Sequence, residues 1–213
     1  MKTTQASVDL AKSVFQVAIS TTPGRVEEQH RLSRTRFQRF FAGRDETEVL
    51  MEACGSAHHW GRELQALGHR VRLLPPSDVA RYRDGNKTDR ADAIALLEAS
   101  RNERIDEVPV KTVEQQALTS LHRLRSAYVA ARTSRINTVR GILREFGHAL
   151  PRGSRTVVAQ ARLALEDEQL PKDLREELAW ALDEIEAFRE KAREITVRIE
   201  RMGHSLPEVA YLR

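Results

Sequence analysis

The chain has 213 residues, 40% of them apolar, and a formal net charge of +4 at pH 7. This length and apolar content support one α/β core with a helical extension. Cys54 is the single cysteine, which excludes an internal disulfide and a cysteine zinc cluster and fits a reducing compartment. The sequence contains no apolar stretch of transmembrane length and no secretory signal. We therefore expect a cytoplasmic protein without membrane partners.

Strand and helix patterns alternate along the first hundred residues. Strands are predicted between residues 5 and 32, at 47–52 and at 69–74, and helices at 34–42, at 57–67 and from Asp89 onward. Pro109 separates this part from two long helices. The predicted fold class is α/β, with an α/β domain over residues 1–108 and a helical, coiled-coil arm over residues 109–213.

Four acidic residues lie where a strand-based nuclease core needs carboxylates. Asp9 lies in segment 6–20, whose β-branched and aromatic residues predict two strands that form a hairpin. Glu52 ends an apolar strand, and the active groups of open α/β sheets gather at that end of their strands. Asp89 and Asp92 are three residues apart on one face of a helix. This set indicates nucleic-acid chemistry.

Most of these carboxylates also have a structural interpretation. The helix macrodipole favours Asp89 in a first turn whatever its function, and Asp9 can be a surface residue of its strand. Glu52 is harder to explain in this way, because glutamate is almost never fully buried unless it is paired. Repulsion between Asp89 and Asp92 costs about 0.2–0.5 kcal/mol unless a cation lies between them, so this pair favours metal binding.

Convergence of the four side chains would create a metal site. Their oxygen atoms favour Mg²⁺ or Mn²⁺ over zinc, and one or two such ions activate a nucleophile and stabilise the leaving oxygen at a phosphodiester. We therefore predict that the four carboxylates are both metal ligands and catalytic residues. Lys12 and Lys87 are candidates for phosphate contacts nearby, although solvent exposure or turn and cap chemistry explains them at least equally well.

Four strings in the first 155 residues resemble, in order and spacing, the DEDD transposases of the insertion-sequence 110 family, in particular its 1111 subgroup. The strings are VDLAKSVFQVAI, MEACGSAHHWGRELQALGHRVRLLPP, GNKTDRADA and RTSRINTVRGILREFG. The resemblance implies a RuvC-like, ribonuclease-H-type fold for the first domain. It also implies that the DEDD carboxylates of the family correspond to Asp9, Glu52, Asp89 and Asp92.

Members of this family recombine DNA under the guidance of a structured bridge RNA that the element encodes. The resemblance therefore implies DNA, a structured guide RNA and a second protomer as partners. It also implies a further domain with a nucleophilic serine after the helical section, and no serine here matches that motif. We expect this chain to be the N-terminal part of such a recombinase and to be unable to complete strand exchange alone.

A basic helix is predicted over residues 112–146. Residues 105–156 contain nine basic and four acidic residues, whereas residues 157–213 contain nine and 13. At 100° per residue, four arginines fall within about a third of the helix circumference and a fifth adds to the cluster. They are Arg125, Arg132, Arg140 and Arg144, with Arg135. Such a stripe can follow a phosphate backbone, and the alternative is a solvated face whose aliphatic stems cover apolar neighbours.

The last helix carries an apolar seam with alternating steps of four and three residues, which is a heptad pattern. Its members include Leu174, Leu178, Ile185, Phe188, Ile195 and Ile199. The seam packs either on the preceding long helix of the same chain or on a second protomer. We predict dimerisation through these residues, and the acidic charge of this section disfavours direct nucleic-acid contact there.

Three function classes follow from these features. The first is a metal-dependent transposase or DNA recombinase that moves an insertion sequence by RNA-guided strand exchange. The second is a stand-alone nuclease of the Holliday-junction-resolving type. The third is a noncatalytic module that binds RNA or DNA through the basic helix and dimerises through the heptads. The carboxylates and the family resemblance favour the first class.

Overall fold

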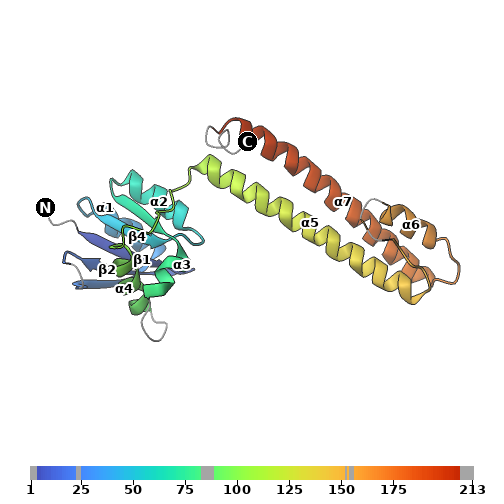
Figure 1. Cartoon of the computed structure of the whole chain (residues 1–213), viewed down its shortest axis with the longest axis horizontal. Coiled ribbons are helices and arrows are strands. Elements are labelled where there is room, and N and C mark those ends of the chain that lie inside the picture. Colours follow the sequence, from blue (N-terminus) through green and yellow to red (C-terminus); the bar gives the residue numbers. More distant parts are fainter. Residues whose placement is uncertain (1–3, 23–24, 83–88, 152, 154–155, 207–213) are drawn as a thin grey trace. The chain divides into compact units, whose positions relative to one another are not determined.

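The computed structural model describes residues 4–22, 25–82, 89–151, 153 and 156–206, without the side chains of residues 89–91. The chain divides into two compact units, residues 1–112 (unit 1) and residues 113–213 (unit 2). Figure 1 shows the sheet with its short helices in unit 1 and the long helices of unit 2. Each unit has its own hydrophobic core.

Unit 1 is built on a five-stranded sheet with the strand order β3-β2-β1-β4-β5. β1, β2 and β3 pair antiparallel, and β4 and β5 run parallel to β1. The strands are β1 (Gln5–Leu10), β2 (Val14–Ser20), β3 (Glu28–Ser33), β4 (Glu48–Glu52) and β5 (Arg70–Leu74). This mixed sheet confirms the α/β class and is compatible with a ribonuclease-H-like fold.

One face of the sheet packs on α1 (Arg34–Ala42) and α2 (Ala57–Ala66), which Figure 1 shows on the same side. Side chains alternate between the faces of a strand, and the apolar residues Val8, Phe15 and Met51 point toward these helices. The ring centroid of Phe37 in α1 lies 4.9–5.1 Å from those of Phe15, Phe41 and Trp60. Steeply inclined aromatic pairs at this separation are favourable, and they lock both helices onto the sheet.

The opposite face of the sheet packs on α4 (Asp89–Ala99), which follows α3 (Pro76–Val79) and the 3₁₀ turn η1 (Ala80–Tyr82). Leu74 at the end of β5 forms a small core with Val79 of α3 and Leu96 of α4. Because successive side chains of a strand point to opposite faces, the residues that alternate with those of the α1–α2 core face α4.

The connection to unit 2 is held against unit 1. Val108 forms an isolated β-bridge with Leu73, and the backbone N–H of Lys111 donates to His58 Nδ1 at 3.2 Å. A Cβ atom at Gly61 would lie 3.0 Å from Val110 Cγ2, so glycine permits this close approach. These contacts place residues 108–112 with unit 1, and the domain boundary predicted at residue 108 stays a prediction.

Unit 2 consists of α5 (Val113–Glu145), α6 (Val157–Ala164) and α7 (Lys172–His204). α5 and α7 lie side by side and antiparallel in Figure 1, since Arg125 contacts Thr196 whereas Arg135, further along α5, contacts Glu184. The buried side chains of their core include Ile136, Val139, Leu143, Leu178, Leu182 and Ile185. Among the described residues, no helix combines the length and apolar character required to cross a membrane.

The heptad residues of α7 face α5 of the same chain. Leu178, Ile185 and Ile195 are buried, and Leu174, Phe188 and Ile199 are partly buried. The Phe188 ring lies 6.3 Å from that of Tyr128 in α5. The intrachain alternative for this seam therefore describes the structure. Dimerisation through these residues and the supercoiled geometry both stay predictions.

Candidate active site and nucleic-acid interface

Asp9 and Glu52 lie on neighbouring parallel strands at matching positions. The β1–β4 register pairs Gln5 with Glu48 and Val8 with Met51, so the same offset aligns Asp9 with Glu52. Val8 and Met51, which directly precede them, belong to the core on α1 and α2, so Asp9 and Glu52 point to the opposite face, which α4 covers. Glu52 is also in register with Leu74, which packs on α4. Asp9 and Glu52 are both only partly buried. The topology thus brings these two carboxylates together at the carboxyl ends of their strands.

α4 carries the other two predicted carboxylates, and it covers the face to which Asp9 and Glu52 point. Asp92 is buried, with 7% of its surface exposed. A carboxylate taken out of water in this way needs hydrogen bonds or positive charge around it. Asp89 begins the helix, and its side chain lies outside the described residues. Asp9, Glu52 and Asp92 therefore belong to one side of the sheet.

Cys54 follows β4 and lies within the electrostatic influence of Glu52 and Asp9. Burial raises the pKa of its thiol, and the negative charges of Glu52 and Asp9 raise it further. The influence of both carboxylates on one sulfur agrees with their alignment across β1 and β4. The thiol therefore stays neutral near pH 7.

Among the described side chains, no three His, Cys, Asp or Glu groups converge closely enough to hold a metal ion together. The aligned pair still fits a hard cation, because carboxylate oxygens are the ligands that Mg²⁺ and Mn²⁺ prefer. Asp9 and Glu52 can thus contribute to a divalent-metal site, with Asp92 on the helix above the same face.

The five arginines predicted as a stripe on α5 have different surroundings. Arg135 pairs with Glu184 at 2.8 Å, and Arg140 donates to the carbonyl oxygen of Pro151 at 2.7 Å. These two side chains therefore help to hold α5 to α7 and to the following linker. Arg144 is exposed, while Arg125 and Arg132 lie at the contact of α5 with α7. A nucleic-acid role for each of the five stays a prediction.

Comparison with known proteins identifies the family. Residues 6–148 match the family model of DEDD transposases of the IS110 type, which is described as a transposase. The chain belongs to this transposase family. The resemblance drawn from the four sequence strings is thereby confirmed, and the matched residues include all four predicted carboxylates and the five arginines of α5.

Several transposases are similar to this family member over most of its length. It is 39% identical over 203 residues to a probable family 20 transposase of Pseudomonas aeruginosa, which covers 94% of this chain and 60% of the relative. It is 37% identical over 161 residues to the transposase for insertion sequence element IS1111A of Coxiella burnetii, with 76% and 44% covered. For the IS1328 transposase of Yersinia enterocolitica the identity is 34% over 168 residues, with 79% and 50% covered. The chain thus spans about half the length of these relatives.

The sheet of this transposase chain adds two residues that the sequence patterns did not reveal. Asp9 pairs with Gln16 of β2, and Gln16 pairs with Arg31 of the edge strand β3. Residues in register share a face, so Glu52, Asp9, Gln16 and Arg31 form one row across four strands. Gln16 is partly buried and Arg31 is exposed. The three-residue turn between β1 and β2 sets this row, and recognising its register would have revealed both residues.

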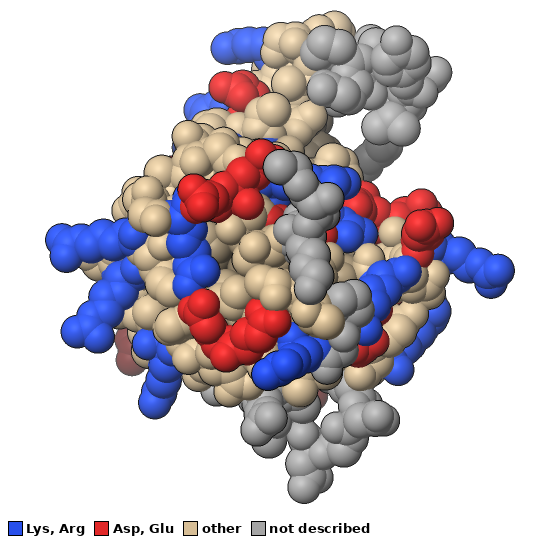
Figure 2. All heavy atoms as spheres, turned by 90° about the vertical axis from the view of Figure 1, so that its left-hand side faces the viewer, with Lys and Arg blue, Asp and Glu red and all other residues tan. Residues whose placement is uncertain are grey.

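Lys12 lies in that turn and is exposed, while Arg34 Nε donates to its carbonyl oxygen at 3.2 Å. Figure 2 shows Lys and Arg side chains projecting around the rim of the face in view, with acidic side chains between them. Charge on the face in view is therefore mixed. Lys87 lies outside the described residues.

Proposed function

We propose that this chain is the metal-dependent DEDD portion of a transposase that moves an insertion sequence by recombining DNA under the guidance of a structured RNA. The observation that supports it best is the alignment of Asp9 with Glu52 across β1 and β4, on the sheet face that α4 covers. Family membership supports the transposase class. The RNA guide and the recombination of the whole protein rest on the family resemblance of the sequence.

In this proposal the carboxylates of Asp9, Glu52, Asp89 and Asp92 hold Mg²⁺ or Mn²⁺. Such ions, when bound, supply the charge that stabilises the attacking and leaving oxygens of a phosphodiester. The protein groups orient the substrate. Gln16 can donate a hydrogen bond from its amide, and Arg31 at the exposed edge can hold the next phosphate along the same row.

The decisive experiment follows the cleavage of labelled branched and linear DNA with Mg²⁺, Mn²⁺ or EDTA. We expect metal-dependent cutting by the unchanged chain and a loss of at least about 100-fold in Asp9→Asn and Asp92→Asn, since each removes a charge that the reaction needs. Glu46→Gln is the matched control, because Glu46 is an exposed carboxylate two residues before β4. Full activity in Asp9→Asn would refute the carboxylate assignment.

Metal binding provides a second readout if the chain cannot cut DNA without further segments. Titration calorimetry with Mn²⁺ should detect binding by the unchanged chain and by Glu46→Gln, and weaker binding by Asp9→Asn and Glu52→Gln. No heat of binding in the unchanged chain, together with no cleavage, would overturn the proposal in favour of a noncatalytic module. Metal-dependent cutting of branched DNA by the chain alone would instead favour a stand-alone nuclease.

A further inference from the structure

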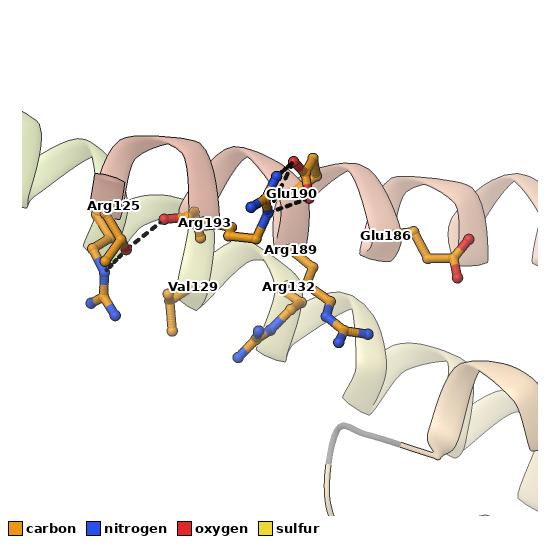
Figure 3. Close-up of a pocket in the computed structure, with 9 residues that line it drawn as sticks. Arg125, Val129, Arg132, Glu186, Arg189, Glu190 and Arg193 are labelled. Atoms are coloured by element: carbon orange, nitrogen blue, oxygen red, sulfur yellow. Dashed lines mark hydrogen bonds and ion pairs between the residues drawn. The ribbon is translucent and has the colours of Figure 1, made fainter. Parts of the chain in front are cut away.

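The contact between α5 and α7 opens into a groove in the middle of unit 2. Its volume is about 660 Å³, and four arginines line it, two from each helix. Arg125 and Arg132 belong to α5, and Arg189 and Arg193 belong to α7 (Figure 3). We name it the arginine groove. The acidic overall charge of the last segment had disfavoured such a role for α7, yet α7 supplies half of the arginines.

The groove exists because arginines occupy positions where an apolar seam would close. Further along α5, Val139 and Leu143 are buried in the core that α5 shares with α7. Arg125 and Arg132 are 14 and seven residues before Val139, so all three share nearly the same angular position on α5. The small side chain of Ala192 on α7 lines the same space. At the levels of Arg125 and Arg132, the two helices are therefore separated by a groove lined with charged side chains instead of being closed by packed apolar ones.

The positive charge of the groove is only partly compensated. Glu190 pairs with Arg193 at 2.6 Å, and Glu186 pairs with Arg162 of α6 at 3.2 Å, so both lining carboxylates already have partners. Among the described residues, no carboxylate forms an ion pair with Arg125, Arg132 or Arg189. An anion that entered the groove would relieve the repulsion between these like charges.

Hydrogen-bonding capacity is also left over in the arginine groove. Arg125 Nε donates to Thr196 Oγ1 at 2.8 Å, which holds that side chain in place. Arg132 Nε is buried and has no hydrogen-bond partner among the described residues. Guanidinium groups bind phosphate through two parallel N–H donors, which matches several arginines around one hollow. The residues that line the groove include no aromatic ring, so it is not built to stack bases.

We propose that the arginine groove binds the phosphodiester backbone of a nucleic acid without reading its sequence. Arg132 and Arg189 contact phosphates, whereas Arg193 is paired with Glu190 and contacts a phosphate only when that ion pair opens. The inference rests on the proposed function only in that a nucleic acid is the ligand of this chain. It requires neither metal nor the carboxylates of unit 1, so it can fail or succeed separately.

The test measures fluorescence anisotropy of labelled oligonucleotides with the full chain in EDTA, between 50 and 200 mM salt. Single-stranded RNA, single-stranded DNA and duplex DNA of one sequence are the probes. The double variant Arg132→Gln/Arg189→Gln removes one groove arginine from each helix. Its matched control, Arg123→Gln/Arg201→Gln, removes one exposed arginine from each helix outside the groove. The two proteins have the same net charge.

We expect the groove variant to bind at least one of the three probes about tenfold or more weakly. The slope of log K against log salt concentration should become shallower by about two, which corresponds to two lost phosphate contacts. The control should lose no more than about threefold. Glu190→Gln should tighten binding by about threefold, because it releases Arg193. Equal losses in the groove and control variants would reduce the effect to general charge and overturn the proposal, as would no loss in the groove variant. The probe that loses most identifies RNA or DNA as the ligand.

Ala192→Met keeps the test valid if removal of arginines disturbs the helix pair. This change fills the groove without altering charge, and Met fits irregular apolar space. We expect weaker binding with unchanged helical circular dichroism.

Asp9→Asn separates the proposed metal site from the arginine groove. If this variant still binds the oligonucleotides but no longer cleaves DNA, both proposals are supported. Lost binding in Ala192→Met with normal cleavage of short DNA supports each independently, and unchanged binding in Ala192→Met would contradict the groove.

Discussion

The two ends of β4 carry glutamates on the same face of the sheet, one buried and one partly buried. At the start of the strand, Glu48 is buried, accepts a hydrogen bond from Gln5 Nε2 at 2.7 Å, and lies 3.5 and 3.6 Å from Arg70 and Arg72. At the end of the strand, Glu52 aligns with a second carboxylate, Asp9. A buried carboxylate held by arginines stabilises the fold, whereas two carboxylates aligned at the ends of parallel strands are suited to binding a cation.

Unit 2 repeats this contrast with arginines. Arg162 on α6 donates to Asp183 at 2.7 Å and to Glu186 at 3.2 Å, and these hydrogen bonds raise the pKa of its guanidinium. Arg132 and Arg189 line one groove and form no ion pair with a described carboxylate. The same residue type therefore has two roles: Arg162 holds α6 to α7, whereas Arg132 and Arg189 are available to a ligand.

The largest expected effect tests the two ends of β4 directly. Glu48→Ala should lower the free energy of unfolding by about 3 kcal/mol, because it leaves the mostly buried Arg72 without one of its carboxylate partners. Glu52→Ala should lower it by clearly less, about 1 kcal/mol at most, since Glu52 is only partly buried whereas Glu48 is buried. Urea unfolding of both variants measures the difference, and equal losses would remove the distinction between the two ends.

The thiol of Cys54 offers a smaller and more local readout. The charge of Asp9 contributes, after burial and Glu52, to the raised pKa of Cys54. In metal-free buffer at pH 8, Asp9→Asn should therefore increase the rate of alkylation several-fold, because a larger fraction of the thiol is ionised. Cys54 is the single cysteine, so incorporation of the label reports this site alone. An unchanged rate would contradict the proximity of Asp9, with Asp45→Asn as the control.

The Arg162 network should contribute less than the buried pair at Glu48. Its side chain and those of Asp183 and Glu186 are 43%, 65% and 56% exposed, so solvent screens the attraction. Arg162→Ala should lower the unfolding free energy by about 0.5 kcal/mol at low salt and by less in 1 M NaCl. A loss that does not depend on salt would point to packing of the aliphatic stem instead.

The smallest effect concerns His58 and acid. Burial, followed by the charges of Lys111 and Arg62, lowers the pKa of its imidazole below the ordinary value of 6.5. The unfolded chain therefore takes up a proton at a higher pH than the folded chain, so the contribution is complete above about pH 6.5 and is lost as pH falls below it. His58→Gln should flatten this part of the stability profile, whereas the exposed His59→Gln should not.

Much of unit 1 was predictable because its patterns are local. The alternation around Asp9, the apolar strand that ends at Glu52 and the break at Pro75 correspond to observed elements. The family was also accessible from short strings. The packing of residues 108–111 on unit 1 was not, because the hydrogen bond from Lys111 to His58 joins residues 53 positions apart.

The candidate sites divide in the same way. Asp9 and Glu52 stand out along the chain, whereas Gln16 and Arg31 enter only through strand register. For α7, the heptad pattern correctly indicated a packed seam, which α5 covers within this chain, and dimerisation stays a prediction. The arginines of the groove carried no pattern that distinguished them from solvated residues on a charged helix.

The sequence by itself determined the family, the order of strands and helices and the chain positions of the four carboxylates, because short-range periodicity and compact motifs specify them. The tertiary structure decided which charged side chains are brought together. Strand register brings Asp9 level with Glu52, and antiparallel pairing brings Arg132 and Arg189 to one groove. Both depend on contacts between residues distant in the chain, which no local pattern encodes.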